Sequence, residues 1–483
     1  MEEKTKTNGK LAPFLEKMDK FFKITERGSN WRREIIGGLV TFLAMCYILA
    51  VNPGMLSGAP VNMPYGGVFL ATALIAGFAT IAMGVFAKMP MGLAPGMGTN
   101  AFFAYSVVGA MGYSWQEALA AGVLGGVLFL ILSITKIRTK ILEAVPKNLR
   151  LAIGAGIGFF IAYIGLRNMG IITFDVGAKL TGLTDFNNPM VWLAVLGLVI
   201  AMVLHARGYR YTLIVSILVT AVVGVIVGEI FINNEYMIGA DFFNGVVGAT
   251  PNFPLISTAK FNYTELGDIK ITASGFVEGF ASKNLWTPQI IMVIITFAFV
   301  DMFDTMGTFL ATAGPAGLIR EDGTIEGAEK GMIVDATATV IGNMLGTPVT
   351  TTYVESSAGI AAGARSGFAS VVTGSLFLLS ILLFPIFQIF SHPAVTGMAL
   401  VLVGVLMATQ LKNIEWDKPE VAIFAFMTII IMVLSYSIAN GIAFGFIFYV
   451  ITMMAQKRFK EVHPVAYGLA GFFVIYYMLQ AIF

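Results

Sequence analysis

The sequence predicts an all-α membrane protein with fourteen spans, and three observations support this fold class. Hydrophobic residues make up 57% of the 483 residues and charged residues only 12%, which leaves too few polar groups to cover a soluble protein of this length. Apolar stretches of roughly 20 residues follow one another, and each is long enough to cross ~30 Å of hydrocarbon. Stretches such as 195–203 are apolar on every face, which excludes the alternating strands of a membrane β-barrel.

Apolar runs bounded by charged residues, proline or glycine define the individual spans, seven in each half of the chain. In the first half we expect spans near residues 35–55, 67–87, 95–111, 117–136, 147–172, 189–206 and 211–231. In the second half we expect them near residues 288–312, 328–345, 355–363, 367–390, 394–411, 419–437 and 440–456. We expect the polar region 232–286 to be an extracellular connection and the apolar segment 464–483 to lie in the membrane interface rather than to span.

Basic residues indicate the orientation of the chain, because Lys and Arg collect in the short cytoplasmic loops of membrane proteins. The first thirty-four residues lack the compact apolar region and cleavage site of a signal peptide. We therefore expect a multi-pass protein of a bacterial inner membrane with its N-terminus in the cytoplasm. The predicted inner loops then contain Lys88, Lys136, Arg138, Lys140, Lys147, Arg150, Arg207, Arg210, Arg320, Lys330, Lys412, Lys418, Lys457, Arg458 and Lys460.

Charge and cysteine content exclude several classes of function. Cys46 is the only cysteine, so the chain has no internal disulfide and no cysteine-ligated metal site. The net charge of +2 is spread over loops and gives no basic patch of the kind that binds nucleic acid. We expect a transporter rather than an enzyme, with no catalytic residues, no metal and no cofactor, and with the lipid bilayer as its surroundings.

The two halves of the chain resemble each other at an offset of roughly 245–255 residues, which indicates an internal repeat. Residues 89–100 and 346–357 open the third and tenth spans and contain too much proline, glycine and β-branched residue to begin as ordinary helices. Because each repeat has an odd number of spans, the second is inverted relative to the first. Interrupted spans in inverted repeats indicate the binding site of a transporter. We expect residues 93–99 and 349–354 to form two short strands near the midplane, each followed by a half-helix.

Acidic residues inside the spans are the strongest candidates for chemistry, because a charge at mid-bilayer costs at least ~2.5–3.5 kcal/mol. Asp301 and Asp304 lie three residues apart in the eighth span, so we expect them to share a helix face. Glu355 stands where the tenth span changes from strand to helix, as a helix cap or a substrate ligand. Asn100 has the corresponding place in the first half, with the same two roles open. Asp335, in the ninth span, is expected to support the site rather than to touch the ligand.

Five sequence strings together resemble a known family. They are Phe-Phe-Lys-Ile-Thr-Glu-Arg-Gly (21–28) with Glu-Ile-Ile-Gly-Gly-Leu-Val-Thr-Phe (34–42), Gly-Leu-Ala-Pro-Gly-Met-Gly-Thr-Asn-Ala-Phe-Phe-Ala-Tyr (92–105), Phe-Val-Asp-Met-Phe-Asp-Thr-Met-Gly-Thr (299–308) and Thr-Thr-Tyr-Val-Glu-Ser-Ser-Ala-Gly-Ile (351–360). The chain resembles the azaguanine-resistance-like branch of the nucleobase:cation symporters, related to xanthine and uracil permeases. The resemblance covers nearly the whole chain.

This resemblance implies a uracil-permease-like fold, often a homodimer, that takes up adenine, guanine or hypoxanthine with protons. It implies that Asp304 and Glu355 hold the base while Asp301 and Asp335 assist. A core domain consists of spans 1–4 and 8–11, and a gate domain of spans 5–7 and 12–14. In this chain the segments are 1–34 (cytoplasmic N-terminal segment), 35–136 and 287–390 (core), 147–231 and 391–460 (gate), 232–286 (connection) and 461–483 (C-terminal apolar helix).

A purine is a flat, uncharged ring with an edge of N–H donors and ring-nitrogen acceptors, so its pocket should offer carboxylates, backbone polar groups and an aromatic face. We expect Glu355, helped by the half-helix dipole, to stay ionised and accept from the base. Asp304 or Asp301 then binds and releases the transported proton, because two nearby acids in low dielectric do not both ionise readily. The remaining candidate contacts are Asn100, Phe102, Phe103, Phe303, Thr352, Tyr353 and Val354.

Several alternatives remain open from the sequence. An anion transporter or exchanger of the same fold is the nearest, because helix N-termini attract anions, although Glu355 would repel them. Sodium coupling is a second, because carboxylates, Thr and unwound carbonyls also suit Na⁺, although we favour protons. A passive channel is less consistent with titratable midplane acids and broken helices. An intramembrane aspartyl protease lacks support, because two acids on one helix cannot face each other across a scissile bond.

Overall fold

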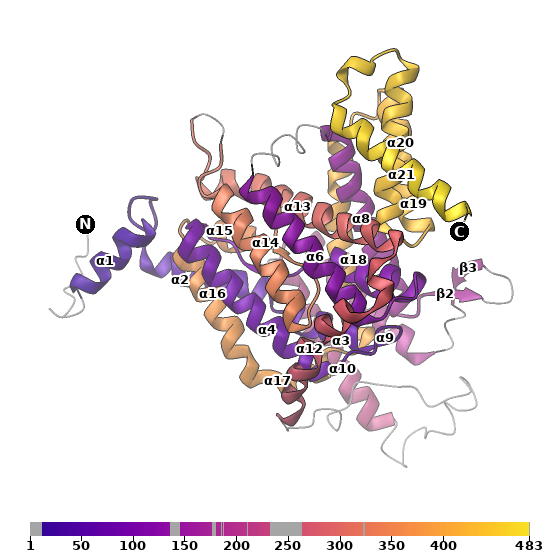
Figure 1. Cartoon of the computed structure of the whole chain (residues 1–483). Helices are drawn as coiled ribbons and strands as arrows, with labels where there is room; N and C mark the ends of the chain where they lie inside the picture. Colours follow the sequence, from indigo (N-terminus) through magenta and orange to yellow (C-terminus); the bar gives the residue numbers. More distant parts are fainter. Residues whose placement is uncertain are drawn as a thin grey trace.

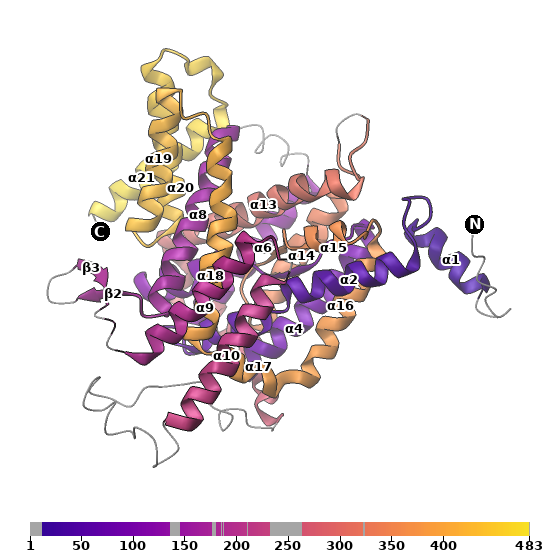
Figure 2. The same cartoon turned by 180° about the vertical axis from the view of Figure 1, so that it is seen from behind.

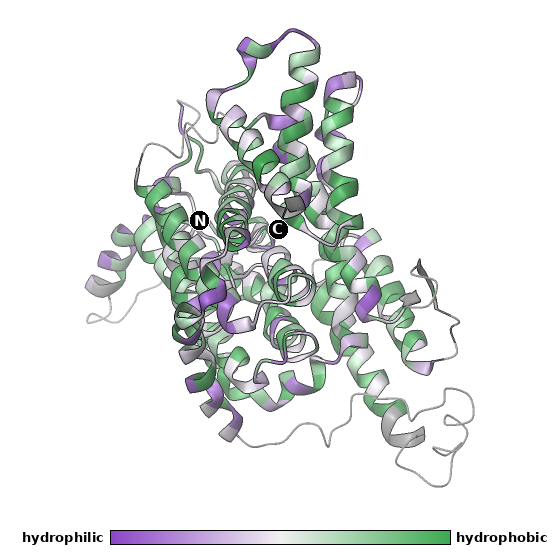
Figure 3. Ribbon diagram, turned by 45° about the vertical axis from the view of Figure 1, so that its right-hand side comes forward, coloured by the Kyte–Doolittle hydropathy of each residue, from purple (hydrophilic) through white to green (hydrophobic). Residues whose placement is uncertain are grey.

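The computed structural model describes residues 12–135, 145–175, 180–184, 186, 188–209, 211–231, 263–321 and 324–482 of the chain. This part is almost entirely helical, which confirms the predicted fold class (Figure 1). Within it, nine helices are long and apolar enough to cross a membrane, and the helical ribbon is largely in the hydrophobic colours (Figure 3). The other predicted spans are the interrupted third and tenth, α10 (Thr212–Phe231), the shorter α19 (Pro419–Leu434) and the more highly charged α14 (Ala328–Leu345).

The first half of the chain begins with a helix that projects from the body of the molecule at its N-terminal end (Figure 1). The first predicted span consists of two helices that meet at Cys46 and Tyr47. In order, the elements are α1 (Ala12–Phe22), α2 (Trp31–Met45), α3 (Ile48–Ser57), α4 (Tyr65–Ala82), η1 (Met83–Ala87), β1 (Leu93–Pro95), α5 (Met97–Ala101), η2 (Phe102–Ala110), α6 (Trp115–Ile134), α8 (Lys147–Asn168), β2 (Ile172–Asp175), β3 (Leu180–Leu183), α9 (Pro189–Ala206) and α10.

The second half repeats this order after a connecting segment. Its elements are η4 (Thr264–Asp268), α12 (Ile269–Ala281), η5 (Lys283–Trp286), α13 (Pro288–Ala316), α14, β4 (Thr350–Thr352), α15 (Ser356–Ala361), α16 (Gly367–Leu379), η6 (Ser380–Leu383), α17 (Phe384–Phe390), α18 (Pro393–Ala408), η7 (Thr409–Asn413), α19, α20 (Ile438–Ala455), η8 (Phe459–Glu461) and α21 (Pro464–Ile482). The C-terminal α21 packs against α20 and stands with α19 at one end of the molecule (Figure 1).

The two interrupted spans meet as antiparallel strands, as the sequence predicts. Leu93 of β1 pairs with Thr352 of β4, and Pro95 pairs with Thr350. Each strand leads directly into a short helix, α5 after β1 and α15 after β4. Strand residues on both sides are fully buried, so the backbone groups here depend on each other rather than on water or lipid.

Glycines allow the long helices to approach each other closely. A Cβ atom added at Gly367 of α16 would overlap the carbonyl oxygen of Gly84 in η1. In the other group of helices, a Cβ at Gly158 of α8 would lie 2.8 Å from the carbonyl oxygen of Gly404 in α18. Helices α8, α9, α10 and α18 lie together when the molecule is seen from behind (Figure 2). These contacts follow the small-residue packing typical of membrane helices.

Three features differ from the sequence prediction or lie beyond it. The connection expected at 232–286 includes the helix α12, which packs against α6 and α14, while residues 232–262 lie outside the described residues. The β2–β3 hairpin follows α8 and was not expected. The loop cations Lys136, Arg138, Lys140 and Arg210 also lie outside the described residues. The division into core and gate domains stays a prediction, as does the placement of 464–483 relative to the bilayer.

We predict that Gly367→Val lowers stability by about 1–3 kcal/mol, because the added side chain must push apart two backbones that touch at Gly84. Thermal unfolding of the purified protein, followed by size-exclusion chromatography, measures this change. Gly468→Val in α21 is the matched control, because nothing lies within 4 Å of a Cβ there. Equal losses in the two variants would contradict the proposed close contact.

Candidate functional site

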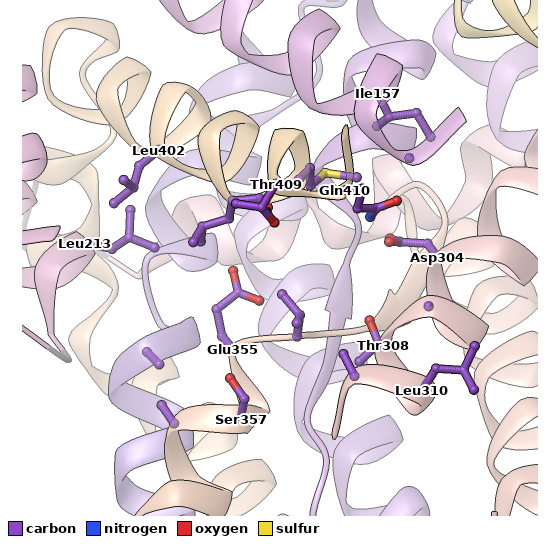
Figure 4. Close-up of a pocket in the computed structure, with 18 of the residues that line it drawn as sticks. Ile157, Leu213, Asp304, Thr308, Leu310, Glu355, Ser357, Leu402, Thr409 and Gln410 are labelled. Atoms are coloured by element: carbon purple, nitrogen blue, oxygen red, sulfur yellow. The ribbon is translucent and has the colours of Figure 1, made fainter. Parts of the chain in front are cut away.

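A pocket of about 710 Å³ lies beside the interrupted tenth span. One wall is formed by α13 and by the residues that join β4 to α15. The facing wall is formed by α8, α18 and η7, and residues from the ends of α9 and α10 complete the lining. Figure 4 shows the lining side chains, with Thr409 and Gln410 on one side of the space and Glu355 and Thr308 on the other.

Two carboxylates lie among the described lining residues. Asp304 comes from the middle of α13 and Glu355 from the end of the β4 segment. In Figure 4 both side chains point into the same space. No described residue donates a hydrogen bond to Asp304, so its oxygens are available to a ligand or to water. The pocket therefore offers hydrogen-bond acceptors to a ligand that carries N–H or O–H donors.

Glu355 is held in place by a residue from the first span. The hydroxyl of Tyr47, at the break between α2 and α3, donates to Glu355 Oε1 over 2.9 Å. The side chain of Glu355 makes no capping hydrogen bond to α15, and the neighbouring Ser356 Oγ instead accepts from the backbone N–H of Gly92. In this conformation Glu355 is a pocket carboxylate rather than a helix cap.

Asp301 does not line the pocket with Asp304, although the two share one helix. A helix turns about 100° per residue, so residues three apart differ by about 60° around the axis. That angle is enough to place Asp304 in the pocket and Asp301 behind it, where its side chain is fully buried. Thr339 of α14 donates to Asp301 Oδ2 over 2.6 Å, and no described residue reaches Oδ1. Asp301 and Asp304 were expected on one helix face, but Asp304 lines the pocket and Asp301 is buried behind it.

Asp335 lies in the same buried layer and accepts two hydrogen bonds. Thr305 of α13 donates to its Oδ2 over 2.7 Å, and Thr352 of β4 donates to its Oδ1 over 3.0 Å. Thr305 is also 2.9 Å from the hydroxyl of Thr351. Threonines thus connect both buried acids to the strand pair.

Asn100 lies away from the pocket and belongs to a separate buried cluster. Its side-chain amide donates to Asn52 Oδ1 over 2.7 Å. Asn52 in turn donates to Thr72 and to Thr347. These two hydrogen bonds connect α3, α4 and the segment before β4. In this structure Asn100 makes a contact between elements and does not touch the pocket.

The other expected contacts are divided between the pocket and the interior. Val354 lines the pocket, as does the ring of Phe303. Phe102 and Phe103 are fully buried and do not line it, and Tyr353 is buried with its hydroxyl donating to the carbonyl of Pro95. Thr352 contributes its side chain to Asp335 and its carbonyl to Thr308, which donates over 3.1 Å.

Sequence reasoning missed several residues that the structure brings to the pocket. Tyr47 lies inside a predicted apolar span, and only the break between α2 and α3 at this position distinguishes it from its neighbours in the chain. Thr308, one turn after Asp304, was inside the family string but was not singled out. Gln410 lies in the 3₁₀ turn after α18, and its amide fits against Gly154 of α8 so closely that a Cβ there would overlap it.

Comparison with known sequences gives consistent relatives over nearly the full length. The chain is 42% identical to the guanine/hypoxanthine permease PbuG of Bacillus subtilis over 95% of this chain and 99% of that one. It is 36% identical to the adenine permease AdeP of Escherichia coli over 95% of each chain.

Solved structures share the fold at low sequence identity. The transmembrane domain of the cyanobacterial bicarbonate transporter BicA aligns with a TM-score of 0.56 at 13% identity, covering 85% of this chain and 97% of that one. The murine anion transporter Slc26a9 aligns with a TM-score of 0.54 at 13% identity, covering 94% of this chain and 74% of that one. Residues 32–444 match the permease family known as Xan_ur_permease. The predicted resemblance is confirmed: the chain is a multi-pass membrane protein of the xanthine/uracil permease family, a transporter and not an enzyme.

Proposed function

We propose that this protein imports purine nucleobases together with protons across a bacterial inner membrane, by alternating access. The observation that carries the proposal is a pocket with two carboxylates, Asp304 and Glu355, in a chain whose relatives are named guanine, hypoxanthine and adenine permeases. Guanine, hypoxanthine and adenine are the substrates to test, and a homodimer is the expected assembly.

The pocket chemistry suits a purine edge. Guanine and hypoxanthine carry an N1–H donor, which an ionised carboxylate accepts, whereas adenine N1 is an acceptor and requires a protonated acid. Glu355, oriented by Tyr47, is the proposed acceptor. Phe303, the residue before Asp304, also lines the pocket and is the proposed aromatic contact. These two carboxylates also disfavour the alternative of an anion substrate, because they would repel it.

The hydrogen bonds around Asp301 support a proton-binding role. Thr339 Oγ1 lies within hydrogen-bond distance of two acceptors, Asp301 Oδ2 at 2.6 Å and the carbonyl of Thr350 at 2.8 Å. A hydroxyl has one hydrogen to donate, so both contacts are satisfied when Asp301 is protonated and donates to Thr339. Asp335 accepts two hydrogen bonds instead, which suits an ionised carboxylate. We propose that Asp301 and Asp304 exchange the transported proton, with Asp335 as the fixed charge beside them.

The pocket mouth indicates which side of the membrane it faces. Lys147 and Arg150, in the first turn of α8, line it, and the distribution of basic residues favours the cytoplasmic side for this end of the helix. With this orientation the conformation described is open to the cytoplasm. The N-terminal segment lies on the same side.

Uptake of radiolabelled purines into proteoliposomes under imposed pH or Na⁺ gradients tests the function. We predict that Glu355→Gln lowers kcat/KM by about 10–100-fold, because a hydrogen bond to a charged group is lost. Glu329→Gln, at an exposed position of α14, is the matched control. Uptake that is driven by Na⁺ and does not depend on pH would show sodium coupling instead of proton coupling. If no purine is taken up, the substrate class is wrong.

We predict that Asp301→Asn and Asp304→Asn abolish the acceleration of uptake by an inward proton gradient, because an amide cannot bind and release the proton. Counterflow exchange of labelled for unlabelled base, which needs no net proton movement, separates loss of coupling from loss of binding. If uptake stays proton-dependent in both variants, the assignment of these two acids is wrong.

We predict that Tyr47→Phe lowers kcat/KM about tenfold, because Glu355 loses the hydroxyl that orients it. Tyr467→Phe, whose exposed hydroxyl donates to the carbonyl of Phe459, is the control. A double-mutant cycle between Tyr47→Phe and Glu355→Gln should be non-additive. Full additivity would show that Tyr47 acts independently of Glu355.

A further inference from the structure

The mouth of the pocket carries basic groups, in contrast to its acidic interior. Lys147 and Arg150 lie in the first turn of α8, and His205 lies in the last turn of α9. All three line the same pocket as Asp304 and Glu355. One continuous space therefore has hydrogen-bond acceptors at one position and cationic donors at another.

Arg150 is the most informative of these residues. Its side chain is partly buried, yet no described residue forms an ion pair or a hydrogen bond with its guanidinium. The acid on the same side of the molecule, Glu415, accepts hydrogen bonds from Asn148 at 3.1 Å and Lys418 at 2.8 Å and interacts electrostatically with Lys147. A guanidinium has five N–H donors in a fork that fits phosphate, and no residue in the described part of the chain accepts from those of Arg150.

The local electrostatics also favour an anion. Cations are disfavoured in the first turn of a helix, where the backbone already presents a partial positive charge. Helix α8 nevertheless has two basic residues and no acid in its first turn, and its N-cap, Pro146, provides no side-chain hydrogen bond. The cytoplasmic preference of basic residues accounts for their presence near the loop. It does not account for a guanidinium that lines a pocket and has no partner among the described residues.

The lining residues of α8 give the extent of the pocket along this helix. They run from Lys147 to Ile157, and Ile157 lies seven residues after Arg150. Seven residues of helix correspond to about 10 Å. The pocket volume of about 710 Å³ is in the range that holds a drug-sized ligand and exceeds what a single nucleobase fills. A ligand longer than a base by a sugar and a phosphate has a comparable reach.

We propose that the pocket also binds purine nucleoside 5′-monophosphates, with the base at Asp304 and Glu355 and the phosphate at Arg150, assisted by Lys147 and His205. This inference rests on the proposed function, because it places the base where the transported purine binds. The nucleotide acts as an inhibitor from the cytoplasmic side. Closing the pocket over a phosphate would require its charges to leave water, which costs several kcal/mol per ion, so the nucleotide occupies the open pocket without being carried.

The consequence is feedback on import. A cell that has converted imported purine into nucleotide then slows further entry of the base, without a separate regulatory domain. The inhibition is competitive with the base and requires the phosphate and the base on one molecule.

Equilibrium binding to the purified full-length protein tests this inference. Radiolabelled guanine is displaced by guanosine 5′-monophosphate, by guanosine and by inorganic phosphate in separate titrations, and the same series is run with adenine and adenosine 5′-monophosphate. We expect the monophosphate to compete more strongly than the nucleoside or phosphate alone. Arg150→Gln should lower the affinity for the monophosphate about tenfold or more. This affinity is expressed relative to the variant's own affinity for the base. Arg150→Lys should give an intermediate loss.

Arg207→Gln is the matched control, because Arg207 is exposed at the end of α9 and is not among the residues that line the pocket. Retained base binding shows that each variant is folded. If the base binds but the monophosphate does not compete, or if inorganic phosphate competes equally well, the inference is wrong. Equal effects of Arg150→Gln and Arg207→Gln would also overturn it. If radiolabelled guanosine 5′-monophosphate, titrated directly, binds through Arg150 while no free purine binds, the proposed transport function fails and the nucleotide site stands.

Discussion

The antiparallel pairing of β1 with β4 is the constraint on which the rest of the structure depends. A span that leaves helical geometry inside a membrane exposes backbone N–H and C=O groups that lipid cannot satisfy. Pairing Leu93 with Thr352 and Pro95 with Thr350 satisfies part of this requirement, and threonine hydroxyls satisfy more of it. Thr308 donates to the carbonyl of Thr352, and Thr339 lies within hydrogen-bond distance of the carbonyl of Thr350. The strand pair thereby fixes the position of α13 and α14 relative to the interrupted spans.

The same threonines determine where charge can exist in the interior. Thr305 and Thr352 hold Asp335, while Thr339 holds Asp301 and a strand carbonyl together. A change in protonation at Asp301 therefore alters a hydrogen bond to the strand that leads to Glu355. This is a physical connection between the buried acids and the pocket that requires no movement of a distant element. Threonine suits these contacts because its short hydroxyl fits between packed backbones.

Much of the fold was predictable because its signals are local. Apolar length defined the spans, and proline, glycine and β-branched residues marked the two interruptions. Within the strands expected at 93–99 and 349–354, residues 93–95 and 350–352 pair, and α5 already begins at Met97. The site was less predictable. Spacing along α13 did not show that Asp301 and Asp304 lie on different sides of the pocket wall, because this depends on where α14 packs. Tyr47, Arg150 and Gln410 reach the pocket from three different helical segments, and no one-dimensional pattern connects them.

The strand pair also has an evolutionary consequence. Its two strands come from the two repeats, yet β1 reads Leu-Ala-Pro and β4 reads Thr-Thr-Thr, so only the second repeat contributes hydroxyls. Asp301, Asp304, Asp335 and Glu355 all belong to the second repeat as well. The two halves therefore contribute different charges to the pocket, acids from the second half and the basic residues Lys147 and Arg150 from the first. Diversification of substrate choice among descendants is then expected to act through the second half at the acidic end of the pocket and through the first half at the basic end.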